Sequence, residues 1–164
     1  MAAPPDPLPR YKYKNLSIPN SLRLLRLRSA AATQDAVKCE LFESQLENTD
    51  LFQEGTRKED YEAVSWCWGN MRQDQPLRVI EGEQAYSFFN SKDLEAALRA
   101  LRYHDKTRLL WVDQICINQN KTSERNEQVP KMNQINGQAK NVCIWVGEPD
   151  DTSHEVIELS RRRS

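Results

Sequence analysis

The chain has 164 residues and a formal net charge of −1 at pH 7, and 29% of its residues are charged. This length is typical of a single domain that buries a hydrophobic core. The balanced charge disfavours a nucleic-acid-binding protein, which normally carries a basic excess. No stretch is apolar enough to span a membrane, and the N-terminus lacks the apolar segment of a signal peptide. We therefore expect a cytoplasmic protein that binds neither nucleic acid nor membrane.

The cysteines are scattered along the chain and form no CxxC pair: Cys39, Cys67, Cys116 and Cys143. Each lies in an apolar run, where a free cysteine packs as a small hydrophobic residue. They predict reduced thiols in the core of a cytoplasmic protein. No ligand spacing supports a zinc site with His104 and His154, so no metal is expected.

The N-terminal part of the chain predicts a tail followed by two strands. Residues 1–10 are proline-rich, which is typical of a disordered tail. Leu22–Arg28, LRLLRLR, is a candidate strand, and Val37–Leu41 alternates, which also predicts a strand. The small, polar segment between them favours a hairpin-like connection, so we expect an antiparallel edge of the sheet here.

Two more strands are expected before the first helix. Tyr61–Trp68 is rich in aromatic and β-branched residues and ends at Gly69, which predicts a strand buried on both faces. Leu77–Ile80 predicts a short edge strand before a turn at Gly82.

The middle of the chain predicts one helix and the central strand. Asn90 or Ser91 is expected to cap the helix. Its apolar stripe consists of Leu94, Ala97, Leu98 and Leu101. The central strand is expected over Arg108–Cys116.

A second helix and a further strand follow. Thr122 or Ser123 is expected to cap the helix, in which Pro130 predicts a kink or a break. The inward face of this helix is expected to comprise Val129, Met132, Ile135 and Ala139. Asn141–Gly147 predicts a buried strand, and His154–Ser160 is expected to begin a helix. The order strand, helix, strand, helix, strand indicates an α/β fold with a mostly parallel sheet.

The most distinctive stretch is Leu109–Gln119, LLWVDQICINQ, in which a buried strand ends in an acidic residue. A lone acid in this place, Asp113, must be paired, hydrogen-bonded or directed toward a cleft. A functional interpretation therefore stands beside a structural one, in which Asp113 accepts loop N–H groups or meets Arg125. Asn118 and Gln119 either line the same site or form a turn.

Motifs of the common catalytic classes, such as GxSxG, the P-loop, GxGxxG and HExxH, are absent from the sequence. Ser65 is expected to be a buried hydroxyl bonded to backbone. Cys116 is interpreted as a core thiol rather than a reactive one, because no histidine is near it in sequence. Glu124 and Arg125 open the second helix, where solvated charge, a favourable helix dipole and a ligand contact remain alternatives. Trp68 is either a core residue or a ring at the mouth of a cleft that stacks a planar ligand.

Three segments resemble the fungal heterokaryon incompatibility (HET) domain. YEAVSWCWGN resembles its first motif, and LLWVDQICINQ followed by ER..QV..M resembles its second. QAKNVCIWVGE resembles the strand that follows. The resemblance covers residues 11–153, and we expect a HET domain over residues 11–160.

The resemblance implies a module of fungal allorecognition, in which non-self contact triggers programmed cell death. Such a module acts by self-association or by binding a protein partner. HET domains also resemble the TIR domains of innate immunity, which implies a flavodoxin-like, mostly parallel sheet with flanking helices. On this likeness the binding or loop residues are Trp68, Gly69, Asp113, Asn118, Gln119 and Arg125.

The later motif of the family, Arg-x-Trp followed by Gln-Glu, is absent from this sequence. We therefore expect the N-terminal portion of a HET domain, without a cofactor and without enzyme activity. One rival hypothesis is a TIR-like NAD glycohydrolase in which Asp113 or Glu124 replaces the missing glutamate. The other is an incomplete HET fragment without function.

Overall fold

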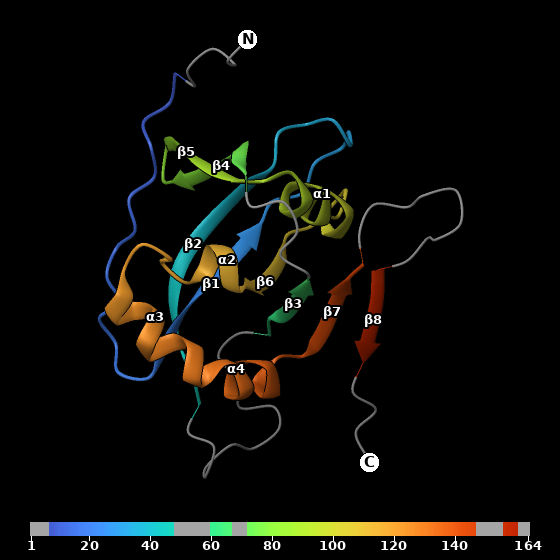
Figure 1. The fold of residues 1–164 in the computed structure, drawn as a ribbon. Helices are drawn as coiled ribbons and strands as arrows, with labels where there is room; N and C mark the ends of the chain where they lie inside the picture. The colour runs from blue at the N-terminus through green and yellow to red at the C-terminus, as the bar shows by residue number, and fades with distance from the viewer. Residues whose placement is uncertain (1–6, 48–59, 67–71, 147–155, 161–164) are drawn as a thin grey trace.

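The structure, a computed structural model, describes residues 7–47, 60–66, 72–146 and 156–160. These segments form an α/β fold around one mixed sheet, with strand order β5-β4-β2-β1-β6-β3-β7-β8 (Figure 1). The strands are β1 (Ser21–Leu27), β2 (Lys38–Gln45), β3 (Glu62–Trp66), β4 (Gln73–Glu81), β5 (Gln84–Ser91), β6 (Arg108–Val112), β7 (Asn141–Trp145) and β8 (Val156–Ser160). The helices are α1 (Lys92–Leu101), α2 (Asp113–Cys116), α3 (Thr122–Gln128) and α4 (Met132–Gln138), with a 3-10 turn, η2 (Val129–Lys131), between the last two.

The prediction of an α/β fold is confirmed, but the prediction of a mostly parallel sheet is wrong. β3 pairs in parallel with β6 on one side and with β7 on the other, as the strand and helix order indicates. Among the described strands, four of the seven neighbouring pairs are antiparallel, because hairpin partners and added outer strands surround this parallel core. β1 and β2 do not form an edge, since β1 lies between β2 and β6.

Two strands were not expected from the sequence. The segment predicted as a short edge strand is the nine-residue β4, and it pairs with the unpredicted β5 through a tight hairpin. The sequence of β5, QAYSFFNS, lacks the regular alternation that identifies a strand. The segment expected to begin a helix after residue 154 instead contributes β8, which pairs with β7.

Local capping chemistry explains the ends of the helices. Ser91 caps α1, because its Oγ accepts the backbone N–H of Leu94 at 3.2 Å, and the predicted stripe of α1 is buried. Neither predicted cap of the second helix is correct, since α3 is preceded by Lys121 without a side-chain cap. The break predicted at Pro130 is confirmed by η2, which separates α3 from α4.

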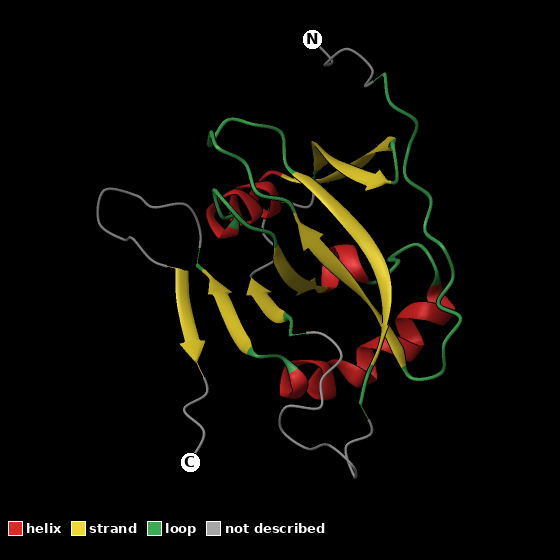
Figure 2. Cartoon of the chain, turned by 180° about the vertical axis from the view of Figure 1, so that it is seen from behind, coloured by secondary structure: helices red, strands yellow, loops and turns green. Residues whose placement is uncertain are grey.

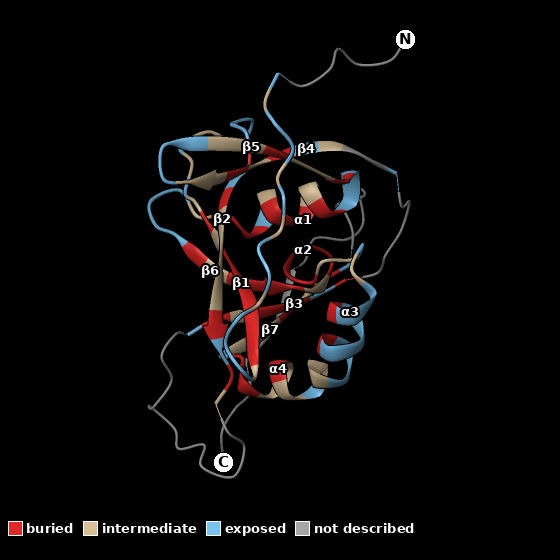
Figure 3. Ribbon diagram, turned by 90° about the vertical axis from the view of Figure 1, so that its left-hand side faces the viewer, coloured by how far each residue is buried: buried red, intermediate tan, exposed pale blue. Residues whose placement is uncertain are grey.

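Figure 2 shows the strongly twisted sheet from behind, with α3 and α4 running across one end of it. The core is built mainly from leucines of β1, α1 and β6 together with Trp111. Figure 3 shows the buried residues along these elements. Ile135 and Ala139 of the second helical segment are buried as predicted, but Val129 is 53% exposed. The 3-10 turn at Pro130 rotates Val129 away from the sheet, so the expected inward stripe is interrupted.

An internal ion pair lies where the parallel strands begin. Arg108 Nε donates to Glu62 Oε2 at 2.5 Å, and Asn141 Nδ2 donates to Glu62 Oε1 at 3.2 Å. Burial alone would raise the pKa of Glu62, but the Arg108 and Asn141 hydrogen bonds outweigh it and lower the pKa. One charged residue from each of β3 and β6 thus fixes the register of the parallel core.

None of the helices in the described segments combines the length and the apolar composition that crossing a bilayer requires.

The two described glycines with a defined environment provide a matched test of the hairpin. Gly82 has φ +60° in the two-residue turn between β4 and β5, where an L side chain is strained, whereas Gly137 lies in α4 with open space around it. Gly82→Ala should lower the free energy of unfolding by about 1 kcal/mol. Gly137→Ala should raise it by about 0.5–1 kcal/mol. Urea unfolding checks both changes, and equal effects of the two substitutions would contradict the turn assignment.

Candidate functional site

A buried ion pair organises the residues that follow the central strand. Arg23 of β1 and Glu124 of α3 are 3% and 5% exposed, and Arg23 Nη1 lies 2.7 Å from Glu124 Oε1. Arg23 Nη1 also donates to the carbonyl oxygen of Cys116 at 2.7 Å, and Nη2 donates to the carbonyl oxygen of Lys14 at 2.8 Å. Glu124 Oε1 accepts the backbone N–H of Asn118 at 2.9 Å. One pair thus joins β1, α2, α3, the loop between the helices and the N-terminal segment.

The loop between α2 and α3 is fixed by its own amide side chains. Asn118 Oδ1 accepts the backbone N–H of Asn120 at 3.2 Å, and Gln119 Nε2 donates to the carbonyl oxygen of Asp113 at 3.0 Å. A further hydrogen bond joins α3 to β1, because Gln128 Nε2 donates to the carbonyl oxygen of Ser21 at 2.9 Å. The turn interpretation of Asn118 is therefore confirmed.

Asp113 lies where the strand β6 ends and α2 begins, rather than inside a strand that continues to Cys116. Its Oδ1 accepts the backbone N–H of Gln114 at 2.8 Å, and its carbonyl oxygen accepts the N–H of Ile117 at 3.1 Å. The side chain is half-buried and bonds at the first turn of α2, where the N–H groups of a helix are otherwise unsatisfied. The structural interpretation, in which Asp113 accepts a loop N–H group, is the one that the geometry supports.

The other predicted site residues are not brought together. Arg125 is exposed, and within the described segments it does not pair with Asp113. Trp68 and Gly69 lie outside the described residues, and so does His154. Ser65 is exposed, which contradicts the expected buried hydroxyl, because its side chain faces outward between buried Val64 and Trp66.

The thiol of Cys116 is enclosed. The residue is 1% exposed, and its Sγ accepts the backbone N–H of Val112 at 3.4 Å. Burial raises the pKa of Cys116 to about 12, although nearby Arg23 acts in the opposite direction. Cys39 and Cys143 are also free and buried, so the prediction of reduced core thiols is confirmed for these three residues. His104 is exposed, and the described segments contain no group of three or more side chains placed to hold a metal ion.

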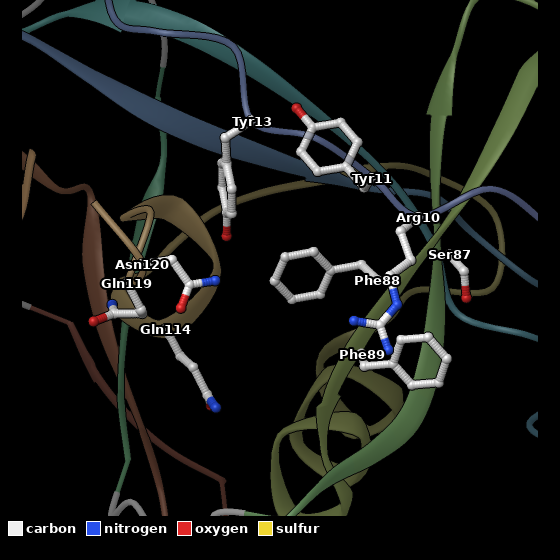
Figure 4. Close-up of a pocket in the computed structure, with 9 residues that line it drawn as sticks. All are labelled: Arg10, Tyr11, Tyr13, Ser87, Phe88, Phe89, Gln114, Gln119 and Asn120. Atoms are coloured by element: carbon white, nitrogen blue, oxygen red, sulfur yellow. The ribbon is translucent and has the colours of Figure 1, made fainter.

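A cavity of about 150 Å³ lies beside this loop (Figure 4). The N-terminal segment covers it, because Pro9 and Tyr11 exchange backbone hydrogen bonds with Ser87 of β5 at 2.8 and 2.9 Å. Tyr13 continues the cover, and its hydroxyl donates to the carbonyl oxygen of Ile115 at 2.7 Å. The lining residues are Arg10, Tyr11, Tyr13, Ser87, Phe88, Phe89, Gln114, Gln119 and Asn120.

Burial also raises the pKa values of the phenols of the cavity. It raises the pKa of Tyr11 to about 12 and raises the pKa of Tyr13 well above its usual range. The Tyr13 ring lies under the Arg23 guanidinium, with 4.7 Å between the guanidinium carbon and the ring centroid. The cavity therefore shares a wall with the buried ion pair.

Sequence reasoning missed three residues of this region, namely Arg23, Tyr13 and Gln114. A signal existed for Arg23, because its charge lies inside the leucine-rich run LRLLRL and must find a partner when that strand is buried. Gln114 lies within the stretch LLWVDQICINQ, but no local pattern indicated a role for it. Tyr13 carried no signal, since its contact with α2 joins residues 102 positions apart.

Comparison with known proteins identifies the family. The family model described as "Heterokaryon incompatibility protein (HET)" matches residues 61–164, which is more than half of the chain. The chain belongs to the HET family. It is also 29% identical over 153 residues to "Heterokaryon incompatibility protein 6, OR allele" of Neurospora crassa. That alignment covers 87% of this chain and 21% of the relative, so the chain spans about a fifth of the length of the relative. No solved structure matches the chain.

The HET match includes Asp113 and Glu124 but begins after β1, so it contains only one partner of the buried ion pair. The HET residues of α3 are divided between two roles. Glu124 and Gln128 face β1 and are buried, whereas Arg125 and Glu127 are exposed. The inward residues of the second HET motif hold the structure together, and its outward residues remain available for contact.

The enclosed position of Cys116 yields a chemical test. Maleimide labelling of the native protein near pH 8 should leave Cys116 unmodified for hours, because the thiol is buried and its pKa is raised. The same thiol should react fully in denaturant, as mapped by peptide mass spectrometry. Native labelling as fast as that of the unfolded chain would contradict the assignment of a core thiol.

Proposed function

We propose that this chain is a cytoplasmic signalling module of heterokaryon incompatibility that acts by self-association or by binding a protein partner. The observation that carries the proposal is the match of the HET family to residues 61–164. The Neurospora crassa relative supports the same role, since its name assigns it to heterokaryon incompatibility. On this proposal, contact of the module with its partner leads to programmed cell death.

The division of α3 into two faces supports binding as the mode of action. The Arg23–Glu124 pair and the Gln128–Ser21 hydrogen bond fix the inner face to β1. The outer face consists of the exposed α3 residues Thr122, Ser123, Arg125, Asn126 and Glu127, and it is followed by exposed Val129 at the start of η2. A rigidly held helix that presents a mixture of polar, charged and apolar side chains is suited to recognise a protein surface.

The rival hypothesis of NAD cleavage is less well supported by the geometry. It requires a carboxylate that is free to stabilise positive charge on a ribose. Glu124 already neutralises Arg23 and accepts the N–H of Asn118, and Asp113 accepts the N–H of Gln114. Both candidate carboxylates are therefore used in holding the fold.

The parallel core also supports a likeness to flavodoxin-like and TIR domains. In the sheet the three strands of this core lie in the order β6-β3-β7. The first of them in the chain, β3, therefore lies between the second and the third, which is the order that begins a doubly wound sheet. We include this likeness in the proposal as a statement about the three central strands alone. The antiparallel strands on both sides are additions to that core.

A charge reversal on the outer face of α3 tests the proposed binding. Arg125→Glu should abolish cell death when the chain is expressed in incompatible hyphae, and it should reduce self-association or partner capture at least about tenfold, because it places a like charge at the contact. Lys92→Glu, an exposed reversal at the start of α1, is the matched control and should retain full activity.

Two results would contradict the proposed binding function. Cell death and association that persist in Arg125→Glu would remove α3 from the contact. Nicotinamide release by the purified chain from NAD would favour the glycohydrolase hypothesis instead.

A further inference from the structure

The two walls of the cavity have different chemistry. One wall is aromatic and is made by Tyr11, Tyr13 and Phe88. Tyr13 and Phe88 meet edge to face, with ring centroids 5.9 Å apart and an interplanar angle of 87°. The opposite wall carries three carboxamides, Gln114, Gln119 and Asn120, from α2 and the loop after it (Figure 4). An aromatic wall that faces a few polar groups is the usual lining of a small-molecule site.

Gln114 is the anomalous residue of this wall. It is 3% exposed, yet neither its Nε2 nor its Oε1 has a hydrogen-bond partner within the described part of the chain. Each unpaired buried group of this kind costs about 1–3 kcal/mol, so nearly all such groups in proteins are satisfied. The other two carboxamides differ, since Gln119 Nε2 donates to the carbonyl oxygen of Asp113 and Asn120 is exposed to solvent.

The charge of the lining and its size limit what can bind. Lining residues include no carboxylate, and Arg10 is stacked on Phe89, with 5.0 Å between its guanidinium carbon and the ring centroid. A cavity of about 150 Å³ holds a single six-membered ring. The Gln114 carboxamide offers one donor, Nε2, and one acceptor, Oε1. A ligand that presents an acceptor and a donor side by side would satisfy both, as when glutamine binds the edge of a planar base.

We propose that the cavity between the N-terminal segment, β5 and α2 binds an uncharged, planar, single-ring molecule with an amide edge, which pairs with Gln114. The aromatic residues Tyr13 and Phe88 contact the ring, and the N-terminal segment covers it. A small molecule fits the site, because a volume of about 150 Å³ matches a single ring. This site is separate from the outer face of α3 and does not depend on its function.

Binding of 2-pyridone to the full chain, followed by a protein-observed NMR titration, tests the proposal. This ring carries a carbonyl and an N–H side by side, and its binding should saturate with a dissociation constant on the order of millimolar. Gln114→Met keeps the length of the side chain and removes its amide. It should weaken binding at least about tenfold while raising the stability of the free protein. Gln84→Met, at an exposed position of β5, is the control and should bind normally.

A second variant keeps the test decisive if Gln114→Met fails to fold. Asn120 is exposed, so Asn120→Trp should fold and should block the mouth of the cavity, abolishing saturable binding. The absence of saturable binding to the wild-type protein would overturn the proposal. Equal binding by the Gln114→Met variant, or equal affinity for toluene, which has no amide edge, would overturn it as well.

Discussion

The buried ion pair between Arg23 and Glu124 is the interaction on which the rest of this structure depends. It joins residues 101 positions apart and contacts three other segments through hydrogen bonds to backbone carbonyl and N–H groups. Removal of either partner would leave an uncompensated charge in the interior, which is far costlier than the loss of an exposed pair. The second HET motif is therefore held in place by a strand that lies outside the family match.

This constraint explains why the second HET motif contributes both buried residues that hold the fold together and exposed residues on the surface. Glu124 and Gln128 bind β1, so the helix has no freedom to rotate, and the intervening Arg125 is directed outward. The loop before α3 is fixed by the N–H of Asn118, and that loop forms one wall of the cavity. A change in the ion pair would thus reach the outer face and the cavity together.

Local patterns predicted the elements whose burial follows a simple period. The stripe of α1, the apolar strand β6 and the break at Pro130 are examples, because each depends on neighbouring residues alone. The sequence did not predict β5 or the insertion of β1 between β2 and β6, since pairing partners far apart in the chain leave no local period. Of the candidate site, the sequence singled out Asp113 and Glu124 but not Arg23, because the contact of Arg23 with Glu124 joins residues 101 positions apart.

A double-mutant cycle on the ion pair tests this account most directly. Arg23→Met and Glu124→Leu should each lower the free energy of unfolding by about 3–5 kcal/mol, and the double variant should recover most of the loss. The partly exposed pair Arg26–Glu40 is the control, for which the coupling should be below about 1 kcal/mol. A double variant as unstable as the sum of its two single changes would show that the pair does not organise the fold.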